Sequence, residues 1–522
     1  MAGHVEVERK YEIDGAAEIA IDDFAGPDGQ VSVEEPETRR LVADYVDTPD
    51  LTLAAHGITL RRRRGGRDEG WHLKVPAAKG SRREVRAPLG SGVHQVPARL
   101  VKLVAAHVRG HELVPIVTVE TTRTTRRLRG EHGEVLAEVA DDVVLGRRLD
   151  VDRRPASWRE VEVELVDGPA GVLDTVEARL RRSGAVPSAA ASKLARVLGD
   201  SPAPGRAPES GRSAGTVLIA YVRRQRDRLL AYDPLVRLAD HDDDSVHKMR
   251  VAVRRIRSLL RTHSRLLDGD RIGPLDAELT WLAGELGTVR DLEVLTARFD
   301  RHLTAHLRDG FDGDGPDKGG AARQRVNDLK SAEWPAHLVA RERRARRELN
   351  KTLRSPRYFA LLTALDDFID APPLRGRARR KAGRLTPAVV AKSWRKVLRR
   401  YAEAEHLPEG PQRDRALHSA RKAAKRARYT AEAATPFLGK PVKKLAEQAE
   451  RLQEALGRRQ DALVARQQLT RLATRPGLTA ADAFTLGLLL ADERHEAAEA
   501  DHALAPTWKK AARPKLLRAL GG

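Results

Sequence analysis

The first 199 residues alternate charged and apolar side chains with a period of two. The clearest case is 160–165, where three glutamates alternate with two valines and a leucine. The same alternation runs through four earlier segments: 5–10, 59–63, 71–75 and 82–86. Successive side chains of a strand point to opposite faces of its sheet. This part is therefore predicted to be β-sheet with one charged face and one apolar face.

The rest of the chain follows a helical period. A segment rich in Pro, Gly and Ser at 200–215 is typical of a linker. Beyond it, apolar residues recur at helical spacing as far as Leu517. We therefore expect two domains, 1–199 and 216–520, joined by the linker 200–215.

One predicted helix, 246–261, carries a stripe of basic side chains on a single face. Its members are His247, Arg250, Arg254, Arg257 and Arg261. No acid is interleaved with them, and like charges at this spacing repel one another by roughly 0.2–0.5 kcal/mol per pair. Such a helix is expected to have an anionic partner.

The stripe occurs twice. In a second predicted helix, 416–429, His418, Arg421, Lys425 and Arg428 repeat the first four members in register. Leu286-Gly287-x-x-Arg290-Asp291 is also echoed by Leu456-Gly457-x-x-Gln460-Asp461, and we expect the polar pairs that end these motifs to hold helices together. The repeat predicts two helical bundles, at about 216–370 and 388–520.

Charge is distributed unevenly between the two parts. The first 200 residues hold 31 Lys and Arg against 33 Asp and Glu, a net charge of −2. Because the whole chain has a net charge of +21, the remainder has a net charge of +23. This excess predicts a polyanionic partner for the helical part.

Other features of the composition exclude whole classes of protein. The chain has no cysteine, which excludes disulfides and thiolate metal sites. Its start is polar, unlike a signal peptide, and no apolar run approaches the roughly 20 residues that span a bilayer. We expect a cytoplasmic protein.

The charged faces of the predicted strands leave two interpretations open. In a half-exposed sheet, these charges face water. If the apolar faces pack under helices instead, the charged faces line a closed barrel. Acids in such a lumen suit Mg²⁺ or Mn²⁺, which prefer oxygen ligands, while Arg and Lys suit phosphate oxygens.

An ordered series of motifs in the first 199 residues resembles a known family, the CYTH or triphosphate tunnel metalloenzyme superfamily. The series is Glu6-x-Glu8-x-Lys10, Tyr45-x-Asp47-Thr48, Leu53, Gly57, Leu60-Arg61-x-Arg63, Trp71-x-Leu73-Lys74, Arg83-Glu84, Arg123, Arg126, Glu138-Val139-Ala140-Asp141-Asp142, Glu160-x-Glu162-x-Glu164 and Ser192-Lys193. The resemblance implies an eight-stranded antiparallel β tunnel barrel with covering helices, which hydrolyses triphosphates with Mg²⁺ or Mn²⁺.

The same resemblance implies roles for individual residues. The implied metal ligands are Glu6, Glu8, Asp142, Glu160, Glu162 and Glu164; the choice between Asp141 and Asp142, and among the last three glutamates, stays open. The implied phosphate ligands are Lys10, Arg61, Arg63, Lys74, Arg123, Arg126 and Lys193. The implied catalytic set is Glu6, Glu8, Lys10, Lys74 and Glu84.

The helical part resembles the CHAD domain, the conserved histidine α-helical domain. The resemblance rests on the two stripes, the two Leu-Gly motifs and Ser355-Pro356-Arg357-Tyr358. It implies polyphosphate binding by His247, Arg250, Arg254, Arg255, Arg257, Arg261, His418, Arg421, Lys422, Lys425, Arg426 and Arg428. For the histidines, structural and phosphate-binding roles stay open, and metal ligation is disfavoured because their neighbours are basic. The resemblance also implies two four-helix bundles related by the duplication, and it adds polyphosphate granules as a possible location in the cell. The whole chain is thus expected to be an α+β multidomain protein.

Several functions remain open. The favoured one is a metal-dependent inorganic triphosphatase, acting on tripolyphosphate and joined to a polyphosphate-binding domain. The alternatives are a non-catalytic polyphosphate-binding protein and a hydrolase or cyclase of an organic triphosphate. Nucleic acid is a weaker rival ligand for the basic helices, because base stacking needs aromatic residues beside the cations and the stripes offer only Tyr429.

Overall fold

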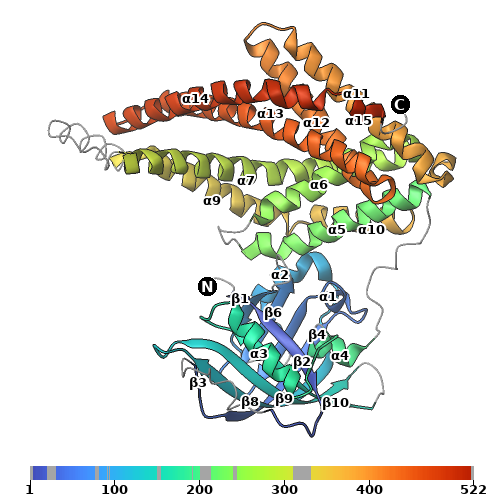
Figure 1. Ribbon diagram of the computed structural model, residues 1–522, viewed down its shortest axis with the longest axis vertical. Coiled ribbons are helices and arrows are strands. Elements are labelled where there is room, and N and C mark those ends of the chain that lie inside the picture. The colour runs from blue at the N-terminus through green and yellow to red at the C-terminus, as the bar shows by residue number, and fades with distance from the viewer. Residues whose placement is uncertain are drawn as a thin grey trace. The chain divides into compact units, whose positions relative to one another are not determined.

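The computed structural model of the protein groups into two compact units (Figure 1). The N-terminal unit is Met1–Ala207 together with Asp233–Asp242, and the helical unit is Pro208–Tyr232 together with Asp243–Gly522. The described residues are 4–19, 31–76, 82–90, 92, 95–149, 154–190, 192–199, 213–238, 244–309 and 331–518. Most of the predicted linker lies outside them, so the domain boundaries stay a prediction.

The N-terminal unit is built on one antiparallel sheet. Its strands are β1 (His4–Glu6), β2 (Glu8–Ile13), β3 (Ser32–Val33), β4 (Glu37–Asp47), β5 (Thr59–Arg64), β6 (Gly70–Pro76), β7 (Arg82–Ala87), β8 (Val114–Arg129), β9 (Val135–Arg148), β10 (Ala156–Leu165) and β11 (Val186–Pro187). Neighbours follow the order β1-β7-β6-β5-β4-β8-β9-β10-β2-β11, with β3 on β8. The predicted antiparallel sheet is confirmed, and its pairing order is that of an open sheet.

One N-terminal segment nevertheless pairs with strands near both ends of this order. β1 pairs with β7, and β2 pairs with β10, where Lys10 lies opposite Glu162. Only Val7 separates the two short strands. Because one segment contacts β7 and β10, the sheet between them must curve strongly.

The strand register divides the side chains into two faces. On the outer face, Tyr11, Val139, Val161 and Val163 are buried in a cluster with apolar residues of α3 (Gly171–Arg182). The opposite, inner face carries two charged rows that cross β2, β10, β9, β8 and β4. One row is Glu12, Glu160, Asp142, Arg123 and Arg39, and the next is Lys10, Glu162, Ala140, Thr125 and Glu37. The predicted charged face is thus continuous over five strands.

Helix α4 (Lys193–Leu198) packs against one end of the inner face. Its Leu194, Val197 and Leu198 join a buried cluster with apolar residues of β4, β8, β9 and β10. Gly146 of β9 makes room for this helix, since a Cβ there would lie 2.3 Å from the Val197 side chain. A helix seated this closely sets its first residue, Lys193, beside the charged rows.

Asp47 of the Tyr45-x-Asp47-Thr48 motif has a structural role. Its buried carboxylate accepts backbone N–H bonds from Thr48, Leu53 and Ala54 at 2.7–2.8 Å. These N–H groups lie at and just before the start of α1 (Thr52–Ala55), where a helix has no internal acceptors of its own. Asp47 therefore fixes the turn between β4 and β5. The remaining helix of this unit is α2 (Ala98–Val108).

The helical unit confirms the predicted all-α region. Its helices are α5 (Ala214–Leu238), α6 (Ser245–Thr262), α7 (Gly269–Asp309), α9 (Trp334–Thr352), α10 (Pro356–Asp370), α11 (Ala382–Glu405), α12 (Pro411–Leu438), α13 (Lys440–Ala473), α14 (Ala480–Ala511) and α15 (Lys515–Arg518), with short 3₁₀ turns at Ser264–Leu266 and Gly376–Arg379. Among the described residues, none of these helices is both long and apolar enough to cross a membrane.

The two basic helices, α6 and α12, pack against each other. Helix α6 buries Val246, Met249, Val253, Ile256 and Leu260, which recur at the three- and four-residue spacing of one helix face. Its basic stripe lies beside that apolar face. The buried positions of α12 are mostly alanines, which let the neighbouring helices approach closely.

The two copies of the repeat share a core. One buried cluster unites Leu292, Leu295 and Phe299 of α7 with residues of α9, α13 and α14. A second cluster lies within the second copy, where it joins α11, α12, α13 and α14. The copies therefore contact each other along their long helices, and the second copy also has a core of its own.

Replacing Asp47 tests its structural role. Asp47→Ala leaves three backbone N–H groups without their acceptor, and a lost buried acceptor costs about 1–3 kcal/mol. We expect the local opening free energy of residues 48–55 to fall by about 2 kcal/mol, which is roughly 30-fold faster hydrogen exchange by mass spectrometry on the full chain. Asp50→Ala, which removes an exposed carboxylate bonded to Thr52, is the control. Equal exchange in the two variants would contradict the assignment.

Candidate metal and phosphate sites

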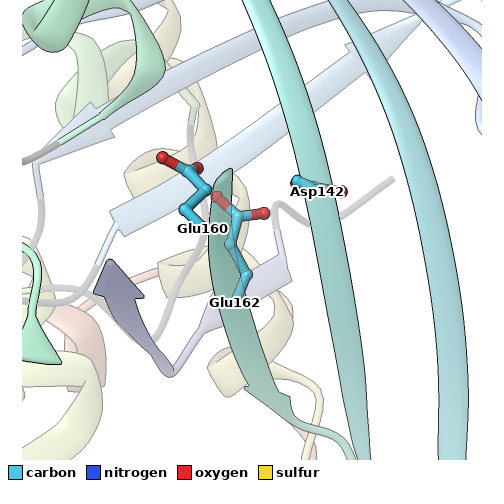
Figure 2. A group of neighbouring side chains, drawn as sticks. All are labelled: Asp142, Glu160 and Glu162. Atoms are coloured by element: carbon cyan, nitrogen blue, oxygen red, sulfur yellow. The ribbon is translucent and has the colours of Figure 1, made fainter. Parts of the chain in front are cut away.

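Three carboxylates meet on the inner face of the sheet (Figure 2). Glu160 and Glu162 come from β10 and Asp142 from the neighbouring strand β9. One ligand oxygen from each lies within 4.8 Å of the others, which makes this the group among the described residues that can hold a metal ion. Asp142 and Glu160 are buried. We call these three residues the acid triad.

Three cations already bind the acid triad. The Lys193 ammonium lies 2.5 Å from Glu160, 2.9 Å from Glu162 and 2.8 Å from Asp142. Arg123 donates to Asp142 at 2.7 and 2.6 Å and to Glu162 at 2.5 Å, and Lys10 donates to Glu162 at 2.6 Å. Three negative and three positive charges leave the cluster close to neutral.

These contacts determine the protonation states. Burial alone raises the pKa of Glu162, but the charges of Lys10, Lys193 and Arg123 lower that pKa well below its usual value. The pKa of Asp142 is also lowered, because the charges of Lys193 and Arg123 outweigh its burial. For Lys193, burial lowers the pKa but the charges of Glu162 and Asp142 raise it further, to a net increase. Asp142, Glu162 and Lys193 are therefore ionised at neutral pH.

The donor set fits a hard divalent cation. Carboxylate oxygens are the ligands that Mg²⁺ and Mn²⁺ prefer. A metal ion alone would make the neutral cluster strongly positive, because Lys193, Arg123 and Lys10 are already there. An anionic ligand that draws these cations away from the acids would restore the balance. The acid triad therefore suits a metal that binds together with a phosphate chain.

Strand alternation places the two neighbouring acids of β9 on opposite faces of the sheet. Asp142 is in the acid triad, whereas Asp141 lies on the outer face and pairs with Arg159 at 2.8 Å. Of the three glutamates on β10, Glu160 and Glu162 belong to the triad. Glu164 shares their face, one row further along the strand, opposite Glu8 and Glu138.

The same alternation separates two arginines. Arg126 lies opposite Val139 and so belongs to the outer face, although it was expected beside Arg123. Arg127 lies opposite Glu138 on the inner face, where it bonds that carboxylate at 3.2 Å. The spacing of Arg123, Thr125 and Arg127 contains this signal, which motif matching alone did not use. Arg127, rather than Arg126, therefore lies on the face that carries Arg123.

The other predicted tunnel residues lie on β1, β2, β5, β6 and β7. Arg61 donates to Tyr45 at 3.2 Å, and Arg63 pairs with Asp68 at 2.6 Å. The charge of Arg61 adds to the effect of burial and lowers the pKa of Arg63 to about 10. Glu8 lies 3.4 Å from Lys10. Glu6 is in β1 opposite Arg82, and its side chain lies outside the described residues.

Glu84 is held by its own contacts on β6 and β7. It is buried, bonds His72 at 2.8 Å and Arg86 at 2.6 Å, and lies 3.9 Å from Lys74. The bond to His72 and the charge of Lys74 outweigh burial and lower the pKa of Glu84. An ionised, paired Glu84 can orient Lys74 but has no proton to donate.

In the helical unit, four members of the stripes form one cationic cluster. Arg250 and Arg254 of α6 act on Arg421 and Lys425 of α12 through their charges. Burial and the charges of Arg254 and Arg421 lower the pKa of Lys425 to about 6. Burial also lowers the pKa of Arg254, and its cationic neighbours add to the effect. These shifts indicate positive charge that the described acids only partly neutralise.

The repeated Leu-Gly motif explains how this cluster is held. The Arg250 guanidinium lies against α7 at Gly287, where a Cβ would come within 3.4 Å, and it donates to Asp291 at 2.9 Å. Arg421 lies against Gly457 of α13 in the same way, with a Cβ distance of 3.2 Å, and donates to Asp461 at 3.3 Å. Each motif thus supplies a gap for a guanidinium and an acid that orients it.

Four further arginines of α6 and α12 pair with acids. Arg257 and Arg261 pair with Asp276, Arg255 with Glu432, and Arg428 with Glu432 and Glu450. Lys422 is exposed, and Arg426 lines a pocket that is described below. The predicted polyphosphate ligands therefore divide into an under-neutralised centre and a paired periphery.

Both histidines lie beside this centre. Burial and the charge of Arg290 lower the pKa of His247, and burial and Lys422 lower the pKa of His418. His418 also bonds Gln460 at 3.1 Å, so the Gln460–Asp461 pair holds α12 to α13 as expected. Both imidazoles are neutral at pH 7 in the absence of a ligand.

Comparison with known proteins identifies the two units. Residues 4–197 match the CYTH domain family, and residues 220–470 match the CHAD domain family. An uncharacterized protein of Mycobacterium tuberculosis H37Rv, Rv2226, is 36% identical over 511 residues, 94% of this chain and 93% of its own. The chain belongs to the family that joins a CYTH domain to a CHAD domain. The predicted order of the two domains is confirmed.

Several solved structures are similar to parts of the chain. PptA from Streptomyces chartreusis shares 24% identity at a TM-score of 0.45, covering 57% of this chain and 99% of its own. The CHAD domain from the plant Ricinus communis shares 25% sequence identity at a TM-score of 0.44, and the match covers 58% of this chain and 97% of that domain's chain. A putative adenylate cyclase from Bacillus halodurans shares 17% sequence identity at a TM-score of 0.25, and the match covers 38% of this chain and 100% of the cyclase chain.

The low pKa of Lys425 can be measured by labelling. A neutral amine reacts with acetic anhydride and an ammonium does not. In the folded chain, we expect acetylation of Lys425 to rise with pH around 6, because burial and neighbouring cations disfavour its charged form. In the urea-unfolded chain, the same residue should respond near pH 10, the ordinary value for lysine. Identical pH profiles, measured by mass spectrometry of the Lys425 peptide, would disprove the shift.

Proposed function

We propose that the CYTH unit is a metal-dependent inorganic triphosphatase and that the CHAD unit binds inorganic polyphosphate. The observation that carries the proposal is the acid triad, bound by Lys193, Arg123 and Lys10 on one charged face. Family membership supports metal dependence, and the balanced charges support a ligand that brings its own negative charge. Cytoplasmic polyphosphate granules remain a proposed location.

The residues of the inner face have distinct proposed tasks. Asp142, Glu160 and Glu162 would hold Mg²⁺ or Mn²⁺, with Glu6, Glu8 and Glu164 as further candidate ligands on neighbouring positions of the sheet. When bound, the metal neutralises phosphate charge and lowers the pKa of a bound water molecule.

The basic residues would bind the phosphate chain. Lys10, Arg123 and Lys193 would exchange their carboxylate partners for phosphate oxygens. Arg61, Arg63, Lys74 and Arg127 would extend the phosphate-binding surface. Glu84 would hold Lys74 in place rather than take part in proton transfer.

The CHAD unit offers a polyanion three arginines and Lys425, which lie close together. On binding, phosphate oxygens would contact Arg250, Arg254, Arg421 and Lys425. The negative charge of the ligand would then offset the repulsion among these side chains. Binding raises the pKa of Lys425 from about 6 toward its ordinary value, so the complex takes up a proton at neutral pH. Affinity for polyphosphate should therefore fall as pH rises above 6, by up to about tenfold per pH unit.

Two adjacent aspartates test the triphosphatase. Asp142→Asn should lower kcat for Mg²⁺- or Mn²⁺-dependent phosphate release from tripolyphosphate by roughly 100-fold or more, because the metal supplies several kcal/mol of the stabilisation. Asp141→Asn, on the opposite face of the same strand, should stay within about threefold of the wild type. Equal losses in both variants, or metal-independent release, would refute the assignment. No release of phosphate by the wild type, with polyphosphate binding intact, would favour the non-catalytic alternative.

Two arginines of α6 test the polyphosphate site. Arg254→Ala should weaken binding of long-chain polyphosphate by roughly 10–100-fold, because each charge-assisted contact contributes about 1.5–3 kcal/mol. Arg257→Ala, which removes a guanidinium already paired with Asp276, should change affinity by less than about threefold. Both variants should retain tripolyphosphate hydrolysis.

Competition with duplex DNA provides the contrasting outcome for this site. Both ligands are polyanions, so a salt titration alone does not distinguish them. Polyphosphate should displace the DNA at equal phosphate concentration. Tighter binding of DNA would overturn the polyphosphate assignment.

A further inference from the structure

A pocket in the helical unit is rimmed by cations. It has a volume of about 460 Å³, within the range of small-molecule sites. Residues of α5, α6, α11 and α12 line it, together with the turns at Ser264–Leu266 and Gly376–Arg379. Its basic residues are Arg261, Arg265, Arg377, Lys392, Lys396 and Arg426, and the lining contains no aspartate or glutamate.

This pocket is separate from the cationic cluster. Its residues on α12 include Ala423, Arg426 and Thr430. At 3.6 residues per turn, these lie on the face opposite to Arg421 and Lys425. A ligand in the pocket would therefore not compete for the Arg250–Arg421 centre.

The positive charge of the rim is largely unneutralised. Among the described residues, Arg261 pairs with Asp276, and none of the other five has an ion pair. The charge of Arg426 is the main cause that lowers the pKa of Lys396, followed by its burial. Burial and the charge of Arg261 in turn lower the pKa of Arg426. Cations that repel one another around a cavity bind an anion readily.

The floor of the pocket is different in kind. It is made of alkyl side chains, among them Val217, Leu218, Leu259 and Ala434. An inorganic phosphate chain has no apolar surface to place on such a floor. Tyr221 also lines the pocket; it is 5% exposed, and its hydroxyl has no hydrogen-bond partner among the described residues. Buried polar groups nearly always have partners, so this hydroxyl is available to a ligand oxygen.

We propose that this pocket binds an organic diphosphate, with the phosphates at the basic rim and the organic group on the alkyl floor. The proposal goes beyond the triphosphatase and polyphosphate functions and does not depend on either. The organic group can be a nucleoside or an alkyl chain. Both share the required chemistry, and separate probes distinguish them.

Calorimetry on the full chain tests the proposal with three probes: ADP, isopentenyl diphosphate and inorganic pyrophosphate. At least one of the two organic diphosphates should bind about tenfold more tightly than pyrophosphate, because only they bury apolar surface on the floor. Tighter binding of ADP identifies a nucleoside ligand, and tighter binding of isopentenyl diphosphate identifies an alkyl ligand. Pyrophosphate binding as tightly as both would overturn the proposal.

Matched variants locate the binding site. Lys396→Ala should weaken the preferred organic diphosphate by about tenfold, because it removes a rim cation. Arg395→Ala, a neighbouring exposed cation of α11 outside the pocket lining, should have less than about a twofold effect. Tyr221→Phe should weaken binding severalfold without unfolding, since it keeps the ring and removes only the hydroxyl. Loss of binding in Arg123→Ala, with Lys396→Ala unaffected, would place the ligand in the CYTH unit and refute the pocket.

Discussion

The contact between Lys193 and the acid triad is the interaction on which the CYTH unit depends. Bringing Asp142, Glu160 and Glu162 together costs electrostatic free energy, and burial increases that cost. Lys193 offsets it with one ammonium that contacts all three carboxylates. The position of that ammonium is set by the packing of α4, which Gly146 permits. Apolar packing at one end of the sheet thus holds the charged site in place.

The CHAD unit uses a different way to keep like charges together. Its cationic cluster is partly neutralised, with Asp291 and Asp461 each orienting one arginine at a glycine of the adjacent helix. Fuller pairing would stabilise the free protein but leave less charge for a ligand. The repeat therefore preserves a compromise in both copies: enough acid to fix the guanidinium groups, and too little to neutralise them.

Much of this arrangement could be predicted from residue spacing. The period of two correctly placed Glu160, Glu162 and Glu164 on one face, and the helical period placed Arg250 and Arg254 together. Residue spacing does not predict ion pairs or hydrogen bonds between residues that are far apart in the sequence. Nothing near Arg257 in the chain indicates that Asp276 neutralises it, and nothing near Asp47 indicates that its carboxylate holds a turn rather than a ligand. Arg126 and Arg127 show that the pattern sometimes contains more than a motif does. Strand alternation from Arg123 indicates Arg127 as the arginine on the same face, whereas the motif indicated Arg126.

The pairing of β2 with β10 also affects how the chain folds. Lys10 and its partner Glu162 are 152 residues apart in sequence. During synthesis, the N-terminal segment must therefore wait with unpaired backbone groups until β10 has emerged, and such long-range pairing is slow. An exposed strand edge invites pairing with other chains, and charged side chains oppose it. Glu6, Glu8, Arg9 and Lys10 thus protect the nascent chain against aggregation before they contribute to a binding site.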